Sequence, residues 1–392
     1  MKKITIILNF LIPFCALSFA QSPYIHKVFE YKPAPGINVN NYPKYEEGDT
    51  QDDMLRKVEE AIVGNEKGVV TLGAYGGYIV FGFDHLVENI PGKYDFKIWG
   101  NAYYSNPSLN AGSCEPGIVM VSFDANGNGI PDDPWFELAG SEYYKPETIK
   151  NYEITYCKPD TNKIPTPHPN IWFLTDTSYI KWVDNQGDVG YVALNAHKKP
   201  PYYPQWMSED TLVFAGTKLV NNGRDETGLG ILYVQYAFPW GYADNHPNDH
   251  IRSNYDIDWA VDEQGKKVNL PGIHFVKVYT GVNQYCGLWG ETSTEITGAE
   301  DFHIQGIDIE VLAVKTEPFP NFKSYYAQGK IVFENFENSF CSIYNINGQI
   351  MDIFNISSSN YIYKTNLVTG IYFITVQRYK DAKMQRFKFV IY

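Results

Sequence analysis

The sequence is poor in basic residues and has no long apolar stretch after its first twenty residues. Its 32 lysines and arginines face 45 aspartates and glutamates, which gives a net charge of −13 at pH 7. Proteins that bind nucleic acid neutralise phosphates with clustered lysines and arginines, so this charge argues against nucleic acid as a partner. Because no further run of about 18 apolar residues exists, we expect no transmembrane segment after position 20.

Cysteines are also few. Apart from Cys15, the chain has Cys114, Cys157, Cys286 and Cys341, and their spacing matches neither a C-x-x-C motif nor a zinc site. An even number permits disulfides, whose pairing the sequence leaves open. Buried free thiols are an equal alternative, because a chain of 392 residues can bury a large core without covalent links.

Motifs of familiar catalytic sites are missing. The chain contains no G-x-S-x-G, no H-E-x-x-H and no G-x-x-x-x-G-K-[ST]. Catalysis would therefore depend on scattered acids, and the cluster Glu291, Glu295, Glu300 and Asp301 would suit a carbohydrate-active hydrolase that uses paired carboxylates. In so acidic a chain, the same cluster is also consistent with ordinary surface charge.

Side-chain oxygens gather in residues 124–133, DANGNGIPDD, where acidic and amide residues alternate and a glycine allows a sharp turn. Calcium prefers several oxygen ligands at flexible spacing, which such a loop supplies. A tryptophan at position 135 and strand-like flanks at 117–123 and 135–138 exclude an EF-hand. A polar hairpin turn with solvated carboxylates is the alternative. The predicted calcium ligands are Asp124, Asn126, Asn128, the Ile130 carbonyl, Asp132 and Asp133.

Aromatic residues make up 16% of the chain, including 31 tyrosines, and such residues offer flat faces for sugars or other ring ligands. Asp244 opens a loop that also holds His246, Asp249 and His250, which could bind a metal or move protons. Asp256 and Asp258 alternate in a strand-like segment and are expected on one face. Packing in the core or in a plain loop is the alternative in each case. The predicted ligand-binding residues are Tyr103, Tyr104, Trp206, Asp244, Trp289 and Glu291.

The N-terminus has the features of a secretory signal peptide. Lys2 and Lys3 precede an apolar run at 4–19, which closes with Ser18-Phe19-Ala20 before Gln21. Cleavage after Ala20 would give a soluble exported protein, secreted or held at the outer cell surface.

The apolar pattern predicts an all-β protein with one helix at 52–63. Short alternating segments separated by Gly, Pro, Asn and Asp favour a jelly-roll β-sandwich over 21–316, with residues 22–50 as an extended lead-in. A linker over 317–329 and a small immunoglobulin-like β-sandwich tail over 330–392 follow. Strands are expected within 68–83, 94–103, 117–123, 135–138, 152–156, 171–173, 190–194, 211–215, 231–237, 257–261, 273–280, 302–314, 330–333, 341–345, 370–378 and 385–392.

The tail contains IYNINGQ at 343–349 and LVTGIYF at 367–373, followed by a basic stretch and an apolar end. These motifs resemble the carboxy-terminal sorting domain of the type IX secretion system of Bacteroidetes. The resemblance implies that the type IX secretion machinery is a partner and that the tail is an export address.

Segments of the main domain are similar to a family of Bacteroidetes cell-surface proteins with galactose-binding-like jelly rolls. They include EPGIV at 115–119, WGYAD at 240–244, YDID at 255–258 and GETSTE at 290–295. Some members are associated with surface nutrient capture, including corrinoid uptake. Together these features predict a non-catalytic surface protein, stabilised by calcium as its cofactor, that binds a small molecule such as a glycan or corrinoid. The alternatives are an extracellular carbohydrate-active hydrolase and a structural surface protein.

Overall fold

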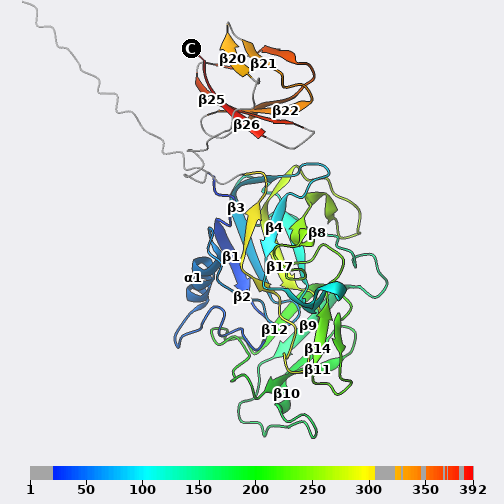
Figure 1. Cartoon of the computed structure of the whole chain (residues 1–392). Coiled ribbons are helices and arrows are strands. Elements are labelled where there is room, and N and C mark those ends of the chain that lie inside the picture. The colour runs from blue at the N-terminus through cyan, green and yellow to red at the C-terminus, as the bar shows by residue number, and fades with distance from the viewer. Residues whose placement is uncertain are drawn as a thin grey trace, which may run out of the picture. The chain divides into compact units, whose positions relative to one another are not determined.

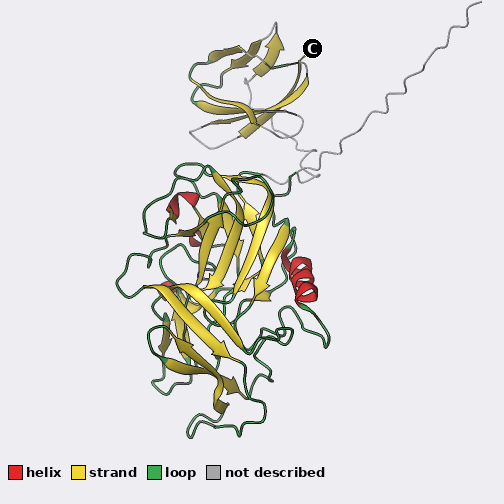
Figure 2. Ribbon diagram, turned by 180° about the vertical axis from the view of Figure 1, so that it is seen from behind, coloured by secondary structure: helices red, strands yellow, loops and turns green. Residues whose placement is uncertain are grey.

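Figure 1 presents a computed structural model of the chain. The structure describes residues 21–304, 323–327, 330–345, 350–364, 367–368, 370–378 and 384–391, so the predicted signal peptide lies outside it. The described chain is rich in strands and has few helices (Figure 2), and the strand pairs among its described residues are antiparallel, which confirms the predicted all-β sandwich class. The chain divides into two compact units, residues 21–306 and 307–392.

The first unit is built on a six-stranded sheet, in which β3 and β17 lie side by side near the centre (Figure 1). Residues 79–83 of β3 are buried on both faces of the sheet, and β17 is buried except at the half-buried His274 and Lys277. In spatial order the strands are β1 (Lys27–Lys32), β3 (Tyr78–Glu88), β17 (Gly272–Thr280), β7 (Gly117–Ser122), β8 (Trp135–Leu138) and β16 (Ala260–Val261).

Four smaller sheets complete this unit. A four-stranded sheet has the order β11 (Val189–Asn195), β10 (Leu174–Asp184), β9 (Ile149–Cys157) and β12 (Thr211–Lys218). Another has the order β13 (Gly223–Asp225), β14 (Tyr233–Tyr236), β6 (Ala111–Ser113) and β5 (Tyr103–Asn106). The last two are β15 (Asn254–Tyr255), β4 (Phe96–Trp99) and β19 (Gly298–Asp301), and the pair β18 (Glu295–Ile296) and β2 (Val70–Thr71).

The largest core joins the six-stranded sheet to the β15-β4-β19 sheet. Phe81 and Val276 from the large sheet share this core with Phe96 and Tyr255 from the small one, and all four side chains are fully or almost fully buried. A second core lies against the β11-β10-β9-β12 sheet and includes Tyr156. These two cores place the loops around residues 71–77 and 282–295 in the interior of the unit.

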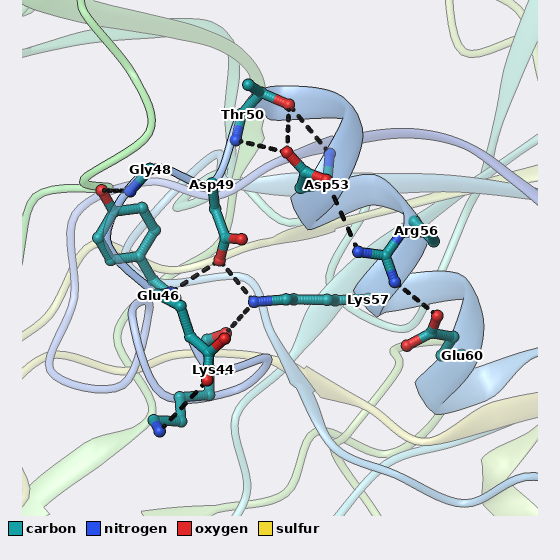
Figure 3. Close-up of polar contacts among 10 residues, drawn as sticks. Lys44, Glu46, Gly48, Asp49, Thr50, Asp53, Arg56, Lys57 and Glu60 are labelled. Carbon is teal, nitrogen blue, oxygen red and sulfur yellow. Dashed lines mark hydrogen bonds and ion pairs between the residues drawn. The ribbon is translucent and has the colours of Figure 1, made fainter.

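Helix α1 (Gln51–Ile62) is the predicted helix and lies beside β1 (Figure 1). Its Val58 and Ile62 side chains are buried in the largest core. Its first turn is closed by a capping box: Thr50 accepts from the Asp53 backbone N–H, and Asp53 accepts from the Thr50 backbone N–H at 3.0 Å. Figure 3 shows this cap together with Lys57, which reaches back to Asp49 at 2.5 Å. Side-chain acceptors thus replace the partners that the first backbone N–H groups of a helix lack.

Three sequence predictions in this unit are wrong. Residues 27–32, predicted as part of an extended lead-in, form β1. Residues 171–173, predicted as strand, lie in a turn before β10, and most of the strand predicted at 302–314 lies outside the described residues. Ile257–Trp259, predicted as strand, form a 3-10 helix because Asp256 accepts the Asp258 backbone N–H at 2.8 Å and starts a tight turn. Asp256 and Asp258 therefore do not share a strand face, and Asp258 pairs with Lys267 at 3.3 Å.

In its described residues, the second unit forms a sandwich of seven strands with its own core. Ile331 and Phe333 from one sheet share that core with Cys341, Ile343 and Ile374 from the other. One sheet has the order β20 (Lys323–Ala327), β21 (Lys330–Glu334) and β24 (Asn360–Lys364). The other has the order β23 (Ile350–Ile356), β22 (Ser339–Asn345), β25 (Gly370–Arg378) and β26 (Met384–Ile391).

The predicted linker, residues 317–329, is only partly described. Its residues 323–327 are strand β20, which pairs with β21, so the linker assignment is wrong for that stretch. Backbone pairing with the next strand decides the structure there, although the segment reads as a connection in the sequence.

Candidate functional site

The predicted calcium loop connects β7 to β8 and is closed by its own hydrogen bonds. Oδ1 of Asp124 accepts the backbone N–H of Gly127 at 2.7 Å and that of Asn128 at 3.1 Å, and Oδ2 accepts that of Gly129 at 2.8 Å. Burial acts to raise the pKa of the Asp124 carboxyl, but these donors lower it overall. Asp124 is therefore held as an anion in a fixed position.

The other predicted calcium ligands gather around Asp132. The side-chain amides of Asn126 and Asn128 each donate to its carboxylate at 3.0 Å. The Ile130 carbonyl accepts the backbone N–H of Asp132 at 2.8 Å, and Asp133 accepts a backbone N–H of the loop. The amide oxygens are used within the loop, because Oδ1 of Asn126 accepts the backbone N–H of Asn128 at 2.9 Å and Oδ1 of Asn128 accepts that of Ile130 at 2.8 Å. The six residues thus lie in one compact loop. Calcium binding there stays a prediction.

A pocket of about 100 Å³ opens between the β11-β10-β9-β12 sheet and the segment that follows β17. Trp182 from β10 and Tyr191 from β11 form its aromatic side. Asn283, Tyr285 and Glu291 form its polar side. Glu291 is one of the predicted ligand-binding residues.

The Glu291 carboxyl group is held close to the backbone on one side and lacks a partner on the other. Its Oε1 accepts the backbone N–H of Ile37 at 2.6 Å. Its Oε2 is buried and has no hydrogen-bond partner within the described part of the chain, and the same is true of the Tyr285 hydroxyl. Burial raises the pKa of Glu291 to about 8, with a smaller contribution from the charge of Glu115. At neutral pH this carboxyl group is therefore mostly protonated.

Gly36 makes the close approach of Glu291 possible. A Cβ atom at Gly36 would stand 2.6 Å from Oε1 of Glu291, which is shorter than any ordinary carbon–oxygen contact. The carboxyl group therefore occupies the space that a side chain at position 36 would fill.

The other predicted ligand-binding residues lie elsewhere. Trp206 stacks between Tyr31 and Tyr45 and donates from Nε1 to Gln51 at 3.0 Å, so it packs at the start of α1. Trp289 is 60% exposed in the turn before Glu291 and does not line the pocket.

Tyr103 and Tyr104 are neighbours on β5 with different surroundings. Tyr103 is 54% exposed, whereas the Tyr104 hydroxyl makes a short hydrogen bond to Nδ1 of His246. His246 also stacks on His250, with ring centroids 4.7 Å apart. Burial lowers the pKa of His246 to about 4, helped by the nearby His250, so this imidazole is neutral at pH 7.

Asp244 belongs to a buried group of three carboxylates. Ligand oxygens of Glu115, Asp244 and Glu295 all lie within 4.8 Å of one another, and this is the one such acidic or metal-ligating group found in the described residues. Oδ1 of Asp244 accepts the backbone N–H groups of Asn101 and Ala102 at 2.7 and 2.8 Å. Asp244 itself has φ +52°, a left-handed conformation in which these bonds hold it.

The acidic residues at 291–301 do not converge on one cleft. Glu291 faces the pocket and Glu295 joins Asp244. Asp301 is buried and binds Nε2 of His85 at 2.9 Å, while Glu300 lies partly exposed on β19. Paired carboxylates across a common substrate are therefore not formed by these four residues.

Sequence reasoning missed Glu115 in the carboxylate group and four residues of the pocket: Trp182, Tyr191, Asn283 and Tyr285. Tyr191 and Glu115 come from a predicted strand or its edge, and Trp182 comes from a segment in which no strand was predicted. Only the pairing of distant segments brings these residues to the two sites. Glu115 directly follows the buried Cys114.

The four cysteines after the predicted signal peptide are free thiols. Burial raises the pKa of both Cys114 and Cys286 to about 12, so they are protonated and unreactive at neutral pH. The structure thus supports buried thiols, the second of the two alternatives for these cysteines.

Comparison with known proteins identifies no family. No protein-family model matches the chain, and no curated protein matches it. Among the described residues, no helix is both long enough and apolar enough to span a membrane.

Proposed function

We propose that this chain is an exported, non-catalytic protein of the outer cell surface that captures a small polar ligand, such as the terminal sugar of a glycan, and is stabilised by calcium. The observation that supports the binding role is a pair of buried polar groups on two residues that line one pocket, Oε2 of Glu291 and the Tyr285 hydroxyl. Each lacks a hydrogen-bond partner within the described residues. Leaving such groups unpaired is costly, and a ligand hydroxyl that reaches either group would pair it.

The pocket's size and charge favour a neutral, hydroxyl-rich group. Its volume of about 100 Å³ is well below the roughly 300–1,000 Å³ that encloses a drug-sized molecule. A protonated Glu291 donates one hydrogen bond and accepts others, as a sugar hydroxyl requires. A corrinoid would place only one edge group inside, so a terminal sugar is the better candidate.

The absence of a second carboxylate in the pocket supports a binding role over a hydrolytic one. Glycoside hydrolysis uses two carboxyl groups on opposite sides of the scissile bond. Glu291 is the only acidic residue among those that line this pocket.

The proposal that the chain is exported rests on its sequence. The signal-like N-terminus and the tail motifs support passage through the type IX secretion machinery, with residues 330–392 as the address. Mass spectrometry of the protein recovered from the cell surface or medium would test this, with Gln21 expected as the first residue.

Binding is tested on residues 21–392 by calorimetric titration with simple sugars, glycan ends and cyanocobalamin. For the sugar that binds, Tyr285→Phe removes one hydrogen bond and is expected to weaken affinity roughly fivefold to tenfold, since such a bond contributes about 1 kcal/mol. Glu291→Gln is expected to weaken it by a similar factor. Tyr42→Phe and Glu263→Gln change exposed residues outside the pocket and serve as matched controls.

Equal affinity in wild type and Tyr285→Phe would exclude this pocket as the binding site. A chain that binds none of the sugars or cobalamin would favour the structural surface protein, and release of free sugar from a glycan would favour the hydrolase.

A further inference from the structure

The β11-β10-β9-β12 sheet has one face in a core and one face toward solvent. Side chains alternate along a strand, and Ile154 and Tyr156 of β9 are buried in the second core. The residues between them belong to the opposite, outer face, where every side chain is exposed or half-buried. The outer-face residues are Glu153, Thr155 and Cys157 of β9, Lys181 and Val183 of β10, Val189 of β11, and Thr211, Val213 and Ala215 of β12.

An apolar row crosses this outer face through all four strands. Thr155 is the ladder partner of both Val213 and Val183, and Val183 is the ladder partner of Val189. Val189 and Val213 are 57% and 47% exposed. A sheet face that meets water usually carries polar side chains at such positions, whereas contiguous exposed apolar residues are typical of a contact surface. The row therefore favours contact with another macromolecule.

Two opposite charges flank the apolar row. Lys181 precedes Val183 by two residues on β10, and Glu153 precedes Thr155 by two residues on β9. Because β9 and β10 are antiparallel, Lys181 and Glu153 lie on opposite sides of the row. Both side chains are exposed, and neither forms an ion pair within the described residues. The outer face thus carries one charge of each sign, although the whole chain has a net charge of −13.

We propose that two copies of this chain associate through this outer face. In a two-fold dimer both copies contribute the same surface, which must therefore complement itself. A two-fold axis that lies in the interface and passes midway between Lys181 and Glu153 brings Lys181 of each copy over Glu153 of the other. The same axis crosses the apolar row between Thr155 and Val183, so the two rows meet at their centres.

Charge favours a second copy over another kind of partner. Copies with a net charge of −13 repel each other over most of their surface, and a face without net charge is where they can approach. A strongly acidic or strongly basic partner would match only one of the two flanking charges, whereas a second copy pairs both. The interface uses none of the residues that line the pocket, so it is independent of the proposed ligand.

Sedimentation velocity of residues 21–392 across a dilution series tests the dimer. We expect a species of twice the chain mass that dissociates on dilution, with a Kd on the order of micromolar. Val213→Glu places an unpaired charge in the interface and should weaken association at least about tenfold. Val368→Glu changes an exposed valine of the second unit and is the matched control, with an unchanged Kd.

A charge exchange tests the orientation of the two copies. Lys181→Glu sets like charges opposite each other at two places and should weaken the dimer at least about tenfold. Adding Glu153→Lys makes the charges opposite again and should return the Kd to within about threefold of the wild type, whereas adding Glu263→Lys, in an exposed turn, should not.

A wild-type protein that stays monomeric at every concentration would overturn the proposal. A dimer that both Val213→Glu and Lys181→Glu leave unchanged would also overturn it, because the two copies would then meet through another surface. A Lys181→Glu dimer that Glu153→Lys does not restore would contradict the two-fold arrangement. All of these positions are exposed, so the variants are expected to fold, and circular dichroism of each one checks this.

Discussion

Glu291 keeps its proton in the folded protein at pH values where an exposed glutamate has lost it. Burial favours the neutral form and raises its pKa to about 8. The folded state therefore binds more protons than the unfolded state between about pH 4.5 and 8. Stability must fall as pH rises through that window, because the unfolded chain gains from ionisation and the folded chain does not.

Glu291→Gln is expected to remove the Glu291 share of this pH dependence, while Glu115, Asp244 and Glu295, whose pKa values burial also raises, keep theirs. The Glu291 share is a fall of roughly 2 kcal/mol in the free energy of unfolding from pH 5 to pH 8, a value reduced from the full shift because Glu291 keeps some solvent exposure. Urea unfolding at pH 5, 6.5 and 8, in chelator, measures the slope. Glu263→Gln should keep the wild-type slope. A Glu291→Gln protein with an unchanged slope would show that Glu291 ionises normally.

The sequence located two of the interesting residues but not their surroundings. Asp244 and Glu291 stand in polar, glycine-containing segments, which marked them as candidates. Trp206 looked equally suitable for a ligand, yet it stacks between Tyr31 and Tyr45. Residue type shows what a side chain can do, and only the neighbours brought by folding decide whether it packs or binds.

At the scale of elements, the start of α1 depends on its capping box. Thr50 accepts the Asp53 N–H, so Thr50→Ala leaves a helix donor without a side-chain partner. We expect the free energy of unfolding to fall by about 1 kcal/mol. Chemical denaturation measures it, with Thr161→Ala, an exposed loop position, as the control. If Thr50→Ala and Thr161→Ala lower the free energy of unfolding equally, the capping hydrogen bond contributes no stability.

The loop between β7 and β8 is tested by Asp124→Ala. If the loop binds calcium, this variant should lose about 5 °C of melting temperature in excess calcium, through loss of the ion's preference for the folded state. In chelator the loss should be much smaller. Asp225→Ala is the control, because Asp225 also accepts loop N–H groups, those of Thr227 and Gly230. If Asp124→Ala lowers the melting temperature equally with and without calcium, the loop is a plain turn that binds no calcium.

The periodicity of apolar residues predicts helices and strands correctly where one face of the element is buried. Residues 52–63 and 273–280 follow their periods closely, and both appear as α1 and β17 within a residue or so. Ile257–Trp259 alternates like a strand but is turned by the Asp256 side chain. A side chain that bonds to the backbone nearby overrides a weak alternating pattern.

At the scale of the whole molecule, the two units have separate cores. Residues 21–306 are built around Phe81 and Tyr156, and the second unit around Phe333 and Ile343. We expect two calorimetric transitions in residues 21–392. A fragment of residues 21–306 should reproduce one of them within about 2 °C, since a shift of that size corresponds to roughly 1 kcal/mol in a domain of this length. A fragment that melts far lower would show that the units stabilise each other.

The sequence by itself determined the all-β class, the helix and the strands of the central sheet other than β1, which reads as an extended lead-in. These follow from the spacing of apolar residues, which depends only on local geometry. It also suggested two units, because the motifs and the charge balance change near residue 330. Tertiary structure alone decided the carboxylate cluster and the pocket. Glu115, Asp244 and Glu295 are separated by 129 and 51 positions in the sequence, and no local pattern records which distant segments an antiparallel fold will place side by side.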